Sequence, residues 1–220
     1  MLDSTSQEYL RALELHKAGR LDDAEEAYLV LLQKSPNHSS ALHNMGVVLA
    51  QKRKQIEAIS YFNRAIEVLP DYAEAYNNRG SALLALGRLD QALQSYNQSL
   101  GIKPDYWKAS LNLANVLMRL NRHQDALNIY SKVLEITTDN YRAIFSSGLA
   151  NLALGNIDAA YNCFLQTMDI RQAKEFSSYD RDIYRCTTRA KLCHDAEQFR
   201  YLSKVDLSDA ELTGLADQYE

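Results

Sequence analysis

Three asparagines recur in this chain at an interval of 34 residues: Asn44, Asn78 and Asn112. The asparagine amide offers both a donor and an acceptor, the pair that the C=O and N–H of a peptide backbone require. Because asparagine is only a middling helix former, three of them at equivalent helical positions need a reason. Such a row of amides is suited to holding an extended peptide without reading its side chains.

Other chemistry has little support in the sequence. The five histidines are dispersed, and no His-Glu-x-x-His or paired Cys-x-x-Cys pattern suggests a metal site. There is also no Gly-x-Ser-x-Gly elbow and no glycine-rich phosphate loop. We therefore predict that the chain has no catalytic residues, no metal and no cofactor, and is not an enzyme.

Charge and hydropathy limit the partners and the compartment. The net charge of −4 and the pI near 5.8 argue against nucleic-acid binding. The basic run of residues 52–54 is predicted to be a solvated turn between helices. The longest apolar run, residues 27–32, is far shorter than the roughly 20 residues that cross a bilayer. The first residues do not resemble a signal peptide, so we predict a cytoplasmic protein without membrane insertion.

The elements that position the asparagines follow the same period of 34 residues. A fixed period of this length is typical of an array whose units bury their apolar faces by stacking on one another. Three sets of residues keep the period: Ala24, Ala58, Ala92, Ala126 and Ala160; Ala12, Gly46, Gly80, Ala114 and Gly148; and Tyr28, Phe62, Tyr96, Tyr130 and Phe164.

Each period contains two helices, since its apolar residues recur at helical spacing. Helix-ending signals between the two helices are Gly19, Gly87 and Gly155, and the aspartates three residues later are predicted to be N-caps. The only prolines, Pro36, Pro70 and Pro104, follow the second helices. The glycines inside the first helices, such as Gly80, are predicted to lie against the alanines of the second helices, such as Ala92.

This unit resembles the tetratricopeptide repeat. The third unit carries the pattern best, with Tyr76, Gly80, Leu83, Ala92, Tyr96 and Pro104. The resemblance implies an all-α fold, a right-handed superhelical solenoid of helix-turn-helix repeats. Five repeats are predicted at residues 5–38, 39–72, 73–106, 107–140 and 141–174. Residues 175–220 are predicted to form a degenerate sixth helix pair and a C-terminal capping helix.

The resemblance also implies that the first helices line a concave groove that binds peptides. The column Asn44, Asn78 and Asn112 is similar to the asparagine ladder of O-linked N-acetylglucosamine transferases, as are residues 75–78 and 112–115. The alternative role for these asparagines is bonding between neighbouring helices. The other predicted groove residues are His43, Asn77, Ser81, Lys108, Asn115, Arg119 and Arg142.

We therefore predict a scaffold that binds extended or helical segments of partner proteins. Lys108, Arg119 and Arg142 favour a ligand with an acidic stretch or a free carboxylate. One alternative is a substrate-recruiting domain of a larger enzyme, of glycosyltransferase or oxygenase type, whose catalytic part follows residue 220. A homodimer formed through apolar groove residues such as Val47 and Phe145 is another.

Overall fold

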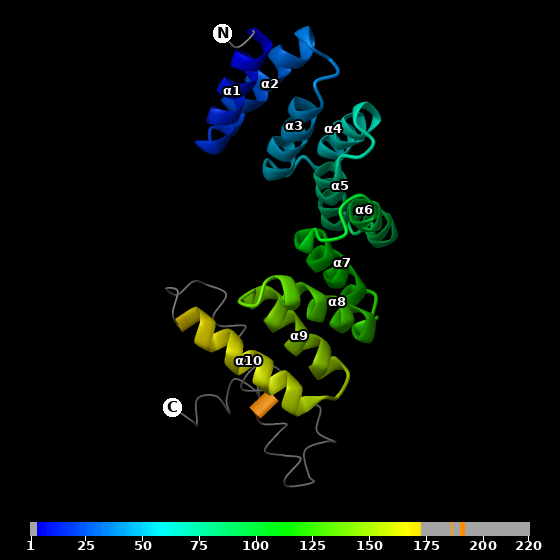
Figure 1. Ribbon diagram of the computed structural model, residues 1–220. Helices are drawn as coiled ribbons and strands as arrows, with labels where there is room; N and C mark the ends of the chain where they lie inside the picture. The colour runs from blue at the N-terminus through cyan, green and yellow to red at the C-terminus, as the bar shows by residue number, and fades with distance from the viewer. Residues whose placement is uncertain (1–3, 173–185, 187–189, 192–220) are drawn as a thin grey trace. The chain divides into compact units, whose positions relative to one another are not determined.

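The computed structural model describes residues 4–172 together with Cys186, Ala190 and Lys191, and over these residues it contains ten α-helices and no strand (Figure 1). The chain divides into two units at Val116, within the seventh helix. The helices are α1 (Ser4–Lys17), α2 (Leu21–Lys34), α3 (Ser39–Gln51), α4 (Gln55–Val68), α5 (Ala73–Ala85), α6 (Leu89–Ile102), α7 (Trp107–Arg119), α8 (His123–Ile136), α9 (Tyr141–Ala153) and α10 (Ile157–Gln172).

Consecutive helices pack as antiparallel pairs, which confirms the predicted all-α repeat solenoid. In the first unit α1 packs on α2, α3 on α4 and α5 on α6, and the contacts of α2 with α3 and of α4 with α5 join the pairs. In the second unit α9 packs on α8 and α10. The predicted helices of residues 175–220 lie outside the described residues, apart from Ala190, which is buried against Ala160 and Phe164.

The glycines inside the first helices make room for aromatic rings. A Cβ atom on Gly80 would lie 2.7 Å from Cε1 of Tyr96, and one on Gly148 would lie 2.5 Å from Cε1 of Phe164. The nearest neighbour of each of these glycines is therefore an aromatic ring, which the sequence analysis did not predict. The ring belongs to the residue four positions after the alanine, one helical turn further along, and its Cδ1, Cε1 and Cζ atoms take the space that a Cβ would fill.

The predicted breaks between the two helices of a repeat are confirmed. Gly19, Gly87 and Gly155 all have a positive φ, of 74°, 74° and 80°. The equivalent residues of the second and fourth repeats, Arg53 and Asn121, adopt the same conformation with φ of 62° and 58°. Arginine pays for this conformation because its Cβ crowds the following carbonyl oxygen, a cost of roughly 1–2 kcal/mol.

Replacing Arg53 by glycine is expected to raise the free energy of unfolding by about 0.5–1 kcal/mol. Glycine adopts the positive φ without a steric cost, although part of the gain is lost to its greater freedom in the unfolded chain. Urea denaturation measures the effect. The matched control is Arg88→Gly, since Arg88 has a φ of −83° and offers no such gain. Equal effects of the two substitutions would contradict the prediction.

The prediction that aspartates cap the second helices is wrong. Helix α2 begins at Leu21, so that Asp22 lies inside its first turn, and Asp90 has the same place in α6. The reason lies in the backbone: the carbonyl of Arg20 already accepts the N–H of Ala24, at 2.9 Å, which starts the helix one residue earlier. In the first turn the carboxylates still interact favourably with the positive end of the helix dipole.

The outer face of α1 is charged where the equivalent faces of later helices are apolar. Glu14 is exposed, whereas the residues at 34-residue intervals from it are buried: Val48, Ala82, Val116 and Ala150. Arg11 is likewise exposed, and its counterparts Met45 and Leu113 are buried, although the third repeat has the half-buried Arg79 at this position. Repeat arrays need such a polar face on a terminal unit to remain soluble. Helix α1 therefore has the surface chemistry of a cap.

Candidate functional site

The predicted asparagines belong to a longer line of polar side chains in the first unit. Asn44, Asn78 and Asn112 lie on the first helices of the second, third and fourth repeats and are half-buried. Hydrogen bonds connect them through three further side chains. We call this line the amide row; its members are Tyr9 of α1, His43 and Asn44 of α3, Asn77 and Asn78 of α5, and Asn112 of α7.

Three bonds of the row cross from one first helix to the next. Asn112 Nδ2 donates to Asn77 Oδ1 at 3.0 Å. Asn78 Nδ2 donates to His43 Nε2 at 2.8 Å. Asn44 Nδ2 donates to the Tyr9 hydroxyl at 3.0 Å. Each bond joins residues 35 apart in the sequence, one more than the repeat length of 34. The bonded residues therefore occupy neighbouring positions of the repeat rather than the same position.

Two bonds between sequence neighbours complete the row. Asn77 Nδ2 donates to Asn78 Oδ1 at 3.1 Å, and His43 Nδ1 lies 3.2 Å from Asn44 Oδ1. An amide nitrogen can only donate and an amide oxygen can only accept, so His43 Nε2 must be the acceptor and Nδ1 must carry the proton. Every donor in the row therefore points in the same direction, from Asn112 towards Tyr9.

The environment of His43 favours the neutral ring that this pattern requires. Burial lowers the pKa of His43 below its ordinary value, and this outweighs the bond with Asn44 and the charge of Glu74, which act in the opposite direction. The rings of Tyr72 and Phe62 pack against the imidazole, with centroids 4.9 and 5.9 Å away. His43 is thus a buried acceptor at the centre of the row.

The row bonds neighbouring first helices to one another and still has capacity for a ligand. Asn44 and Asn78 each use one N–H and one lone pair of the carbonyl oxygen within the row. The Asn78 amide therefore has a second N–H and a second lone pair to offer, whereas the Asn44 amide also interacts with the buried Tyr28 hydroxyl; both asparagine side chains are partly exposed. Contact between these asparagines and a ligand remains a prediction.

The other predicted groove residues are not part of the amide row. Ser81 bonds the Asn77 carbonyl of its own helix and the Tyr96 hydroxyl, both at 3.2 Å. Lys108 is exposed and lies over the Trp107 ring at 5.6 Å, and Asn115 is half-buried on the same helix. Arg119 and Arg142 belong to the second unit and are exposed; Arg142 lies 5.9 Å from the centroid of the Tyr141 ring.

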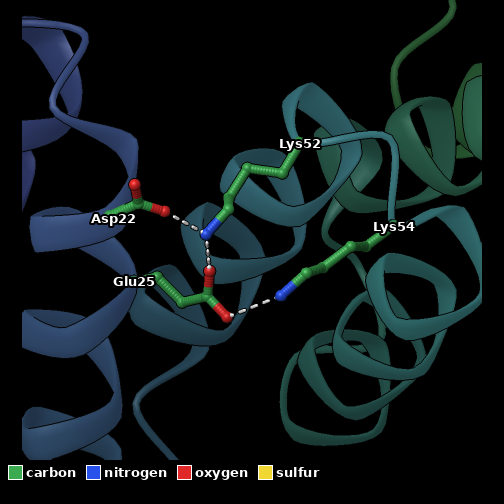
Figure 2. A network of polar contacts seen from close by, with 4 residues as sticks. All are labelled: Asp22, Glu25, Lys52 and Lys54. Carbon is green, nitrogen blue, oxygen red and sulfur yellow. Dashed lines mark hydrogen bonds and ion pairs between the residues drawn. The ribbon is translucent and has the colours of Figure 1, made fainter.

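The sequence analysis missed an ionic network between the first two repeats. Figure 2 shows Lys52 Nζ donating to both Asp22 and Glu25, while Lys54 Nζ lies 3.2 Å from Glu25 Oε1. The basic run is therefore not simply a solvated turn, since two of its residues bind the preceding repeat. Hydrogen bonds from Lys52 lower the pKa of Asp22 and of Glu25 below their ordinary values. Acid weakens the network, because the stabilising carboxylate charges are lost as they become protonated.

The comparisons with known proteins identify the family. Three family models, each described as a tetratricopeptide repeat, match residues 9–67, 39–105 and 83–146, which together span more than half of the 220 residues. The chain belongs to the tetratricopeptide repeat family. These models describe the repeat in general and do not single out the type found in O-linked N-acetylglucosamine transferases. A comparison with curated proteins found no match.

Solved structures share the fold at low sequence identity. A MamA protein is 23% identical with a TM-score of 0.68, and the match covers 79% of this chain and 96% of that one. YrrB, described as a protein with an unusual peptide-binding site, is 16% identical with a TM-score of 0.65 over 78% of this chain and 85% of that one. PilF of Pseudomonas aeruginosa is 15% identical with a TM-score of 0.77, covering 97% of each chain.

Two further properties concern the described residues alone. In residues 4–172, none of the helices combines the length and the apolar character needed to cross a membrane. Over the same part of the chain, histidine, cysteine and acidic side chains form no group of three that could hold a metal ion.

Proposed function

We propose that this protein is an interaction scaffold without catalytic activity, and that it binds an extended or helical segment of a partner protein along the first helices of its first unit. Tetratricopeptide repeat proteins generally bind protein partners. The observation that carries the proposal here is the amide row, because it places half-exposed donors and acceptors at the same position of successive repeats.

The row is matched to a peptide backbone rather than to particular side chains. A backbone in extended form presents N–H and C=O groups at regular intervals, and a partly exposed amide with one spare donor and one spare acceptor can bond both. Because the amides are already held by their neighbours, little side-chain freedom is lost on binding. The resemblance to the asparagine ladder of the glycosyltransferases supports this mode of binding.

The basic side chains next to the row favour an acidic segment. Lys108 is exposed one turn before Asn112, so a carboxylate near that end of the ligand would gain a charge-assisted hydrogen bond. Ordering an extended peptide opposes these contacts, and the affinity is expected to be modest, about micromolar or roughly −8 kcal/mol. If the gene continues into an enzyme domain, the same surface would recruit the substrates of that enzyme.

Replacing Asn44, Asn78 and Asn112 together by alanine is expected to weaken peptide binding at least tenfold. Each lost backbone bond contributes about 0.5–1.5 kcal/mol, so three of them exceed the 1.4 kcal/mol that corresponds to a factor of ten. A displayed library of peptides of natural sequence, selected on the wild-type protein, supplies the ligand, and calorimetry measures its dissociation constant for each variant.

The control is a second triple variant on the exposed surface of the second helices, in which Gln94, Asn97 and Asn128 become alanine. Its affinity is expected to equal that of the wild type. Circular dichroism must show the same helix content in both triple variants; the row variant is expected to unfold at lower urea because inter-helix bonds are lost. Unchanged binding by a folded row variant would refute the proposed site.

A further inference from the structure

We propose that the amide row is a two-state relay in which the presence or absence of a proton on His43 Nε2 sets the direction of the hydrogen bonds through α5 and α7. The relay is a property of the chain alone. Only its consequence for a ligand rests on the proposed function.

The geometry of the row allows its direction to reverse without movement of the backbone. Asn78 bonds through both ends of its amide, with Nδ2 on His43 and Oδ1 on Asn77. Asn77 does the same, with Nδ2 on Asn78 and Oδ1 on Asn112. A half-turn of an amide about its last side-chain bond exchanges oxygen and nitrogen at the same two places. Reversal of one amide therefore makes reversal of the next one favourable.

His43 is the member of the row that can impose this reversal. In the neutral ring Nε2 accepts from Asn78, but in the imidazolium both nitrogens donate. Two donors would then face each other across the 2.8 Å between His43 Nε2 and Asn78 Nδ2. If Asn78 turns its oxygen to the ring, Asn77 and then Asn112 must turn as well. The bond to Asn44 is unaffected, because His43 Nδ1 donates in both states.

The surroundings of the ring place the reversal on the acidic side of neutrality. Burial among Phe62 of α4 and Tyr72 at the start of α5 is the largest influence and keeps the ring neutral. His16 of α1 acts in the same direction, whereas Glu74 of α5 favours the charged ring. Glu74 is partly offset by Lys103, whose Nζ lies 3.8 Å from its carboxylate. The relay therefore runs towards Tyr9 at neutral pH and reverses on α5 and α7 as the pH falls.

Reversal would change what the row presents to a peptide. The spare donor and acceptor of Asn78 and of Asn112 exchange places, while the amide of Asn44 keeps its orientation. A backbone that matches the whole row at neutral pH would then match only one end of it. On the proposed function, acidification is expected to weaken a ligand that bonds all three asparagines.

The decisive experiment compares two isosteric variants that place the same charge on opposite nitrogens of His43. In Asn44→Asp the carboxylate accepts from Nδ1, so the neutral ring keeps the tautomer in which Nε2 accepts from Asn78, although the added charge raises the pKa of the ring in both variants. In Asn78→Asp the carboxylate faces Nε2 and forces a proton onto it. Both variants keep their other bonds, because the Tyr9 hydroxyl can donate to Asp at position 44 and Asn77 still donates to Asp at position 78.

Nitrogen-15 NMR of the protein, with labelled histidine and asparagine, reads the state of each ring and amide nitrogen directly. The His43 signals are assigned by their loss in His43→Gln. We expect an unprotonated Nε2 in the wild type at neutral pH, and in Asn44→Asp at a pH above the titration of its ring, with a coupling through the hydrogen bond to Asn78 Nδ2. In Asn78→Asp we expect a protonated Nε2 and a midpoint of titration shifted to higher pH.

On acidification of the wild type, the coupling is expected to disappear while the amide signals of Asn77, Asn78 and Asn112 shift with the midpoint of His43. The proposal is overturned if Nε2 of the wild type already carries the proton at neutral pH, if the two aspartate variants show the same tautomer above their titrations, or if Asn77 and Asn112 do not respond. None of these readouts involves a ligand, so failure of the relay and failure of peptide binding are separate outcomes.

Discussion

Replacing Tyr96 by alanine is expected to lower the free energy of unfolding by about 3–5 kcal/mol, the range for removing a buried aromatic ring. Tyr96 is fully buried between α5 and α6, and its ring occupies the space that Gly80 leaves in the facing helix. Alanine would leave a cavity bordered by the glycine, and neither helix could close it without breaking its contacts with neighbouring repeats.

The conservative substitution Tyr96→Phe separates the ring from its hydroxyl. Burial raises the pKa of Tyr96 to about 12, and the hydroxyl bonds Ser81 at 3.2 Å. Phenylalanine keeps the ring, as Phe62 and Phe164 do at the equivalent positions, so the expected cost is about 1 kcal/mol. Urea denaturation followed by circular dichroism measures both. A loss below about 2 kcal/mol for Tyr96→Ala would show that the repeat closes over the cavity.

Replacing Ala92 by leucine is expected to cost about 1–3 kcal/mol through overpacking. Ala92 has no exposed surface in α6, where the helix packs closely on α5. The three extra carbon atoms have no free space and would force the two helices apart or push Tyr96 from its place over Gly80. Thermal unfolding monitored by calorimetry gives the change in stability.

The control for this substitution is Ala85→Leu. Ala85 is exposed at the end of α5, and the same change there is expected to alter stability by less than about 0.5 kcal/mol. If Ala92→Leu were as well tolerated as Ala85→Leu, the close approach of the two helices would not be a source of stability in this repeat.

The helices and their order could be predicted from the sequence because the period, the glycines and the prolines act locally. Gly87 ends its helix through its own φ, and Pro104 cannot continue the preceding helix. Which side chain packs against a small residue depends on the rotamers of its neighbours. The contact of Gly80 with the Tyr96 ring was therefore not predictable from sequence spacing. Nor was the first residue of α6, which a backbone bond between Arg88 and Ala92 determines.

The candidate site was predictable only in part for a similar reason. A period of 34 residues identifies a column such as Asn44 and Asn78, but hydrogen bonds form between residues 35 apart, for example between His43 and Asn78. The bonds thus connect two neighbouring positions of the repeat, that of His43 and Asn77 and that of Asn44 and Asn78, which a period of 34 residues does not relate to each other. His43 was predicted to share the groove, yet its central position depends on the offset between neighbouring first helices, which the repeat length does not reveal.

The charged face of α1 has a consequence for assembly. In a repeat array each unit stacks on the next in the same way. Separate copies whose two ends are complementary can therefore join head to tail into open filaments. Such growth would require another helix to cover Glu8, Arg11 and Glu14, whereas every later repeat has a buried apolar residue at the position of Glu14. Glu8 is moreover already bound to Lys34 at 2.6 Å. Burying charged groups without partners costs free energy, which disfavours polymerisation through this face of α1.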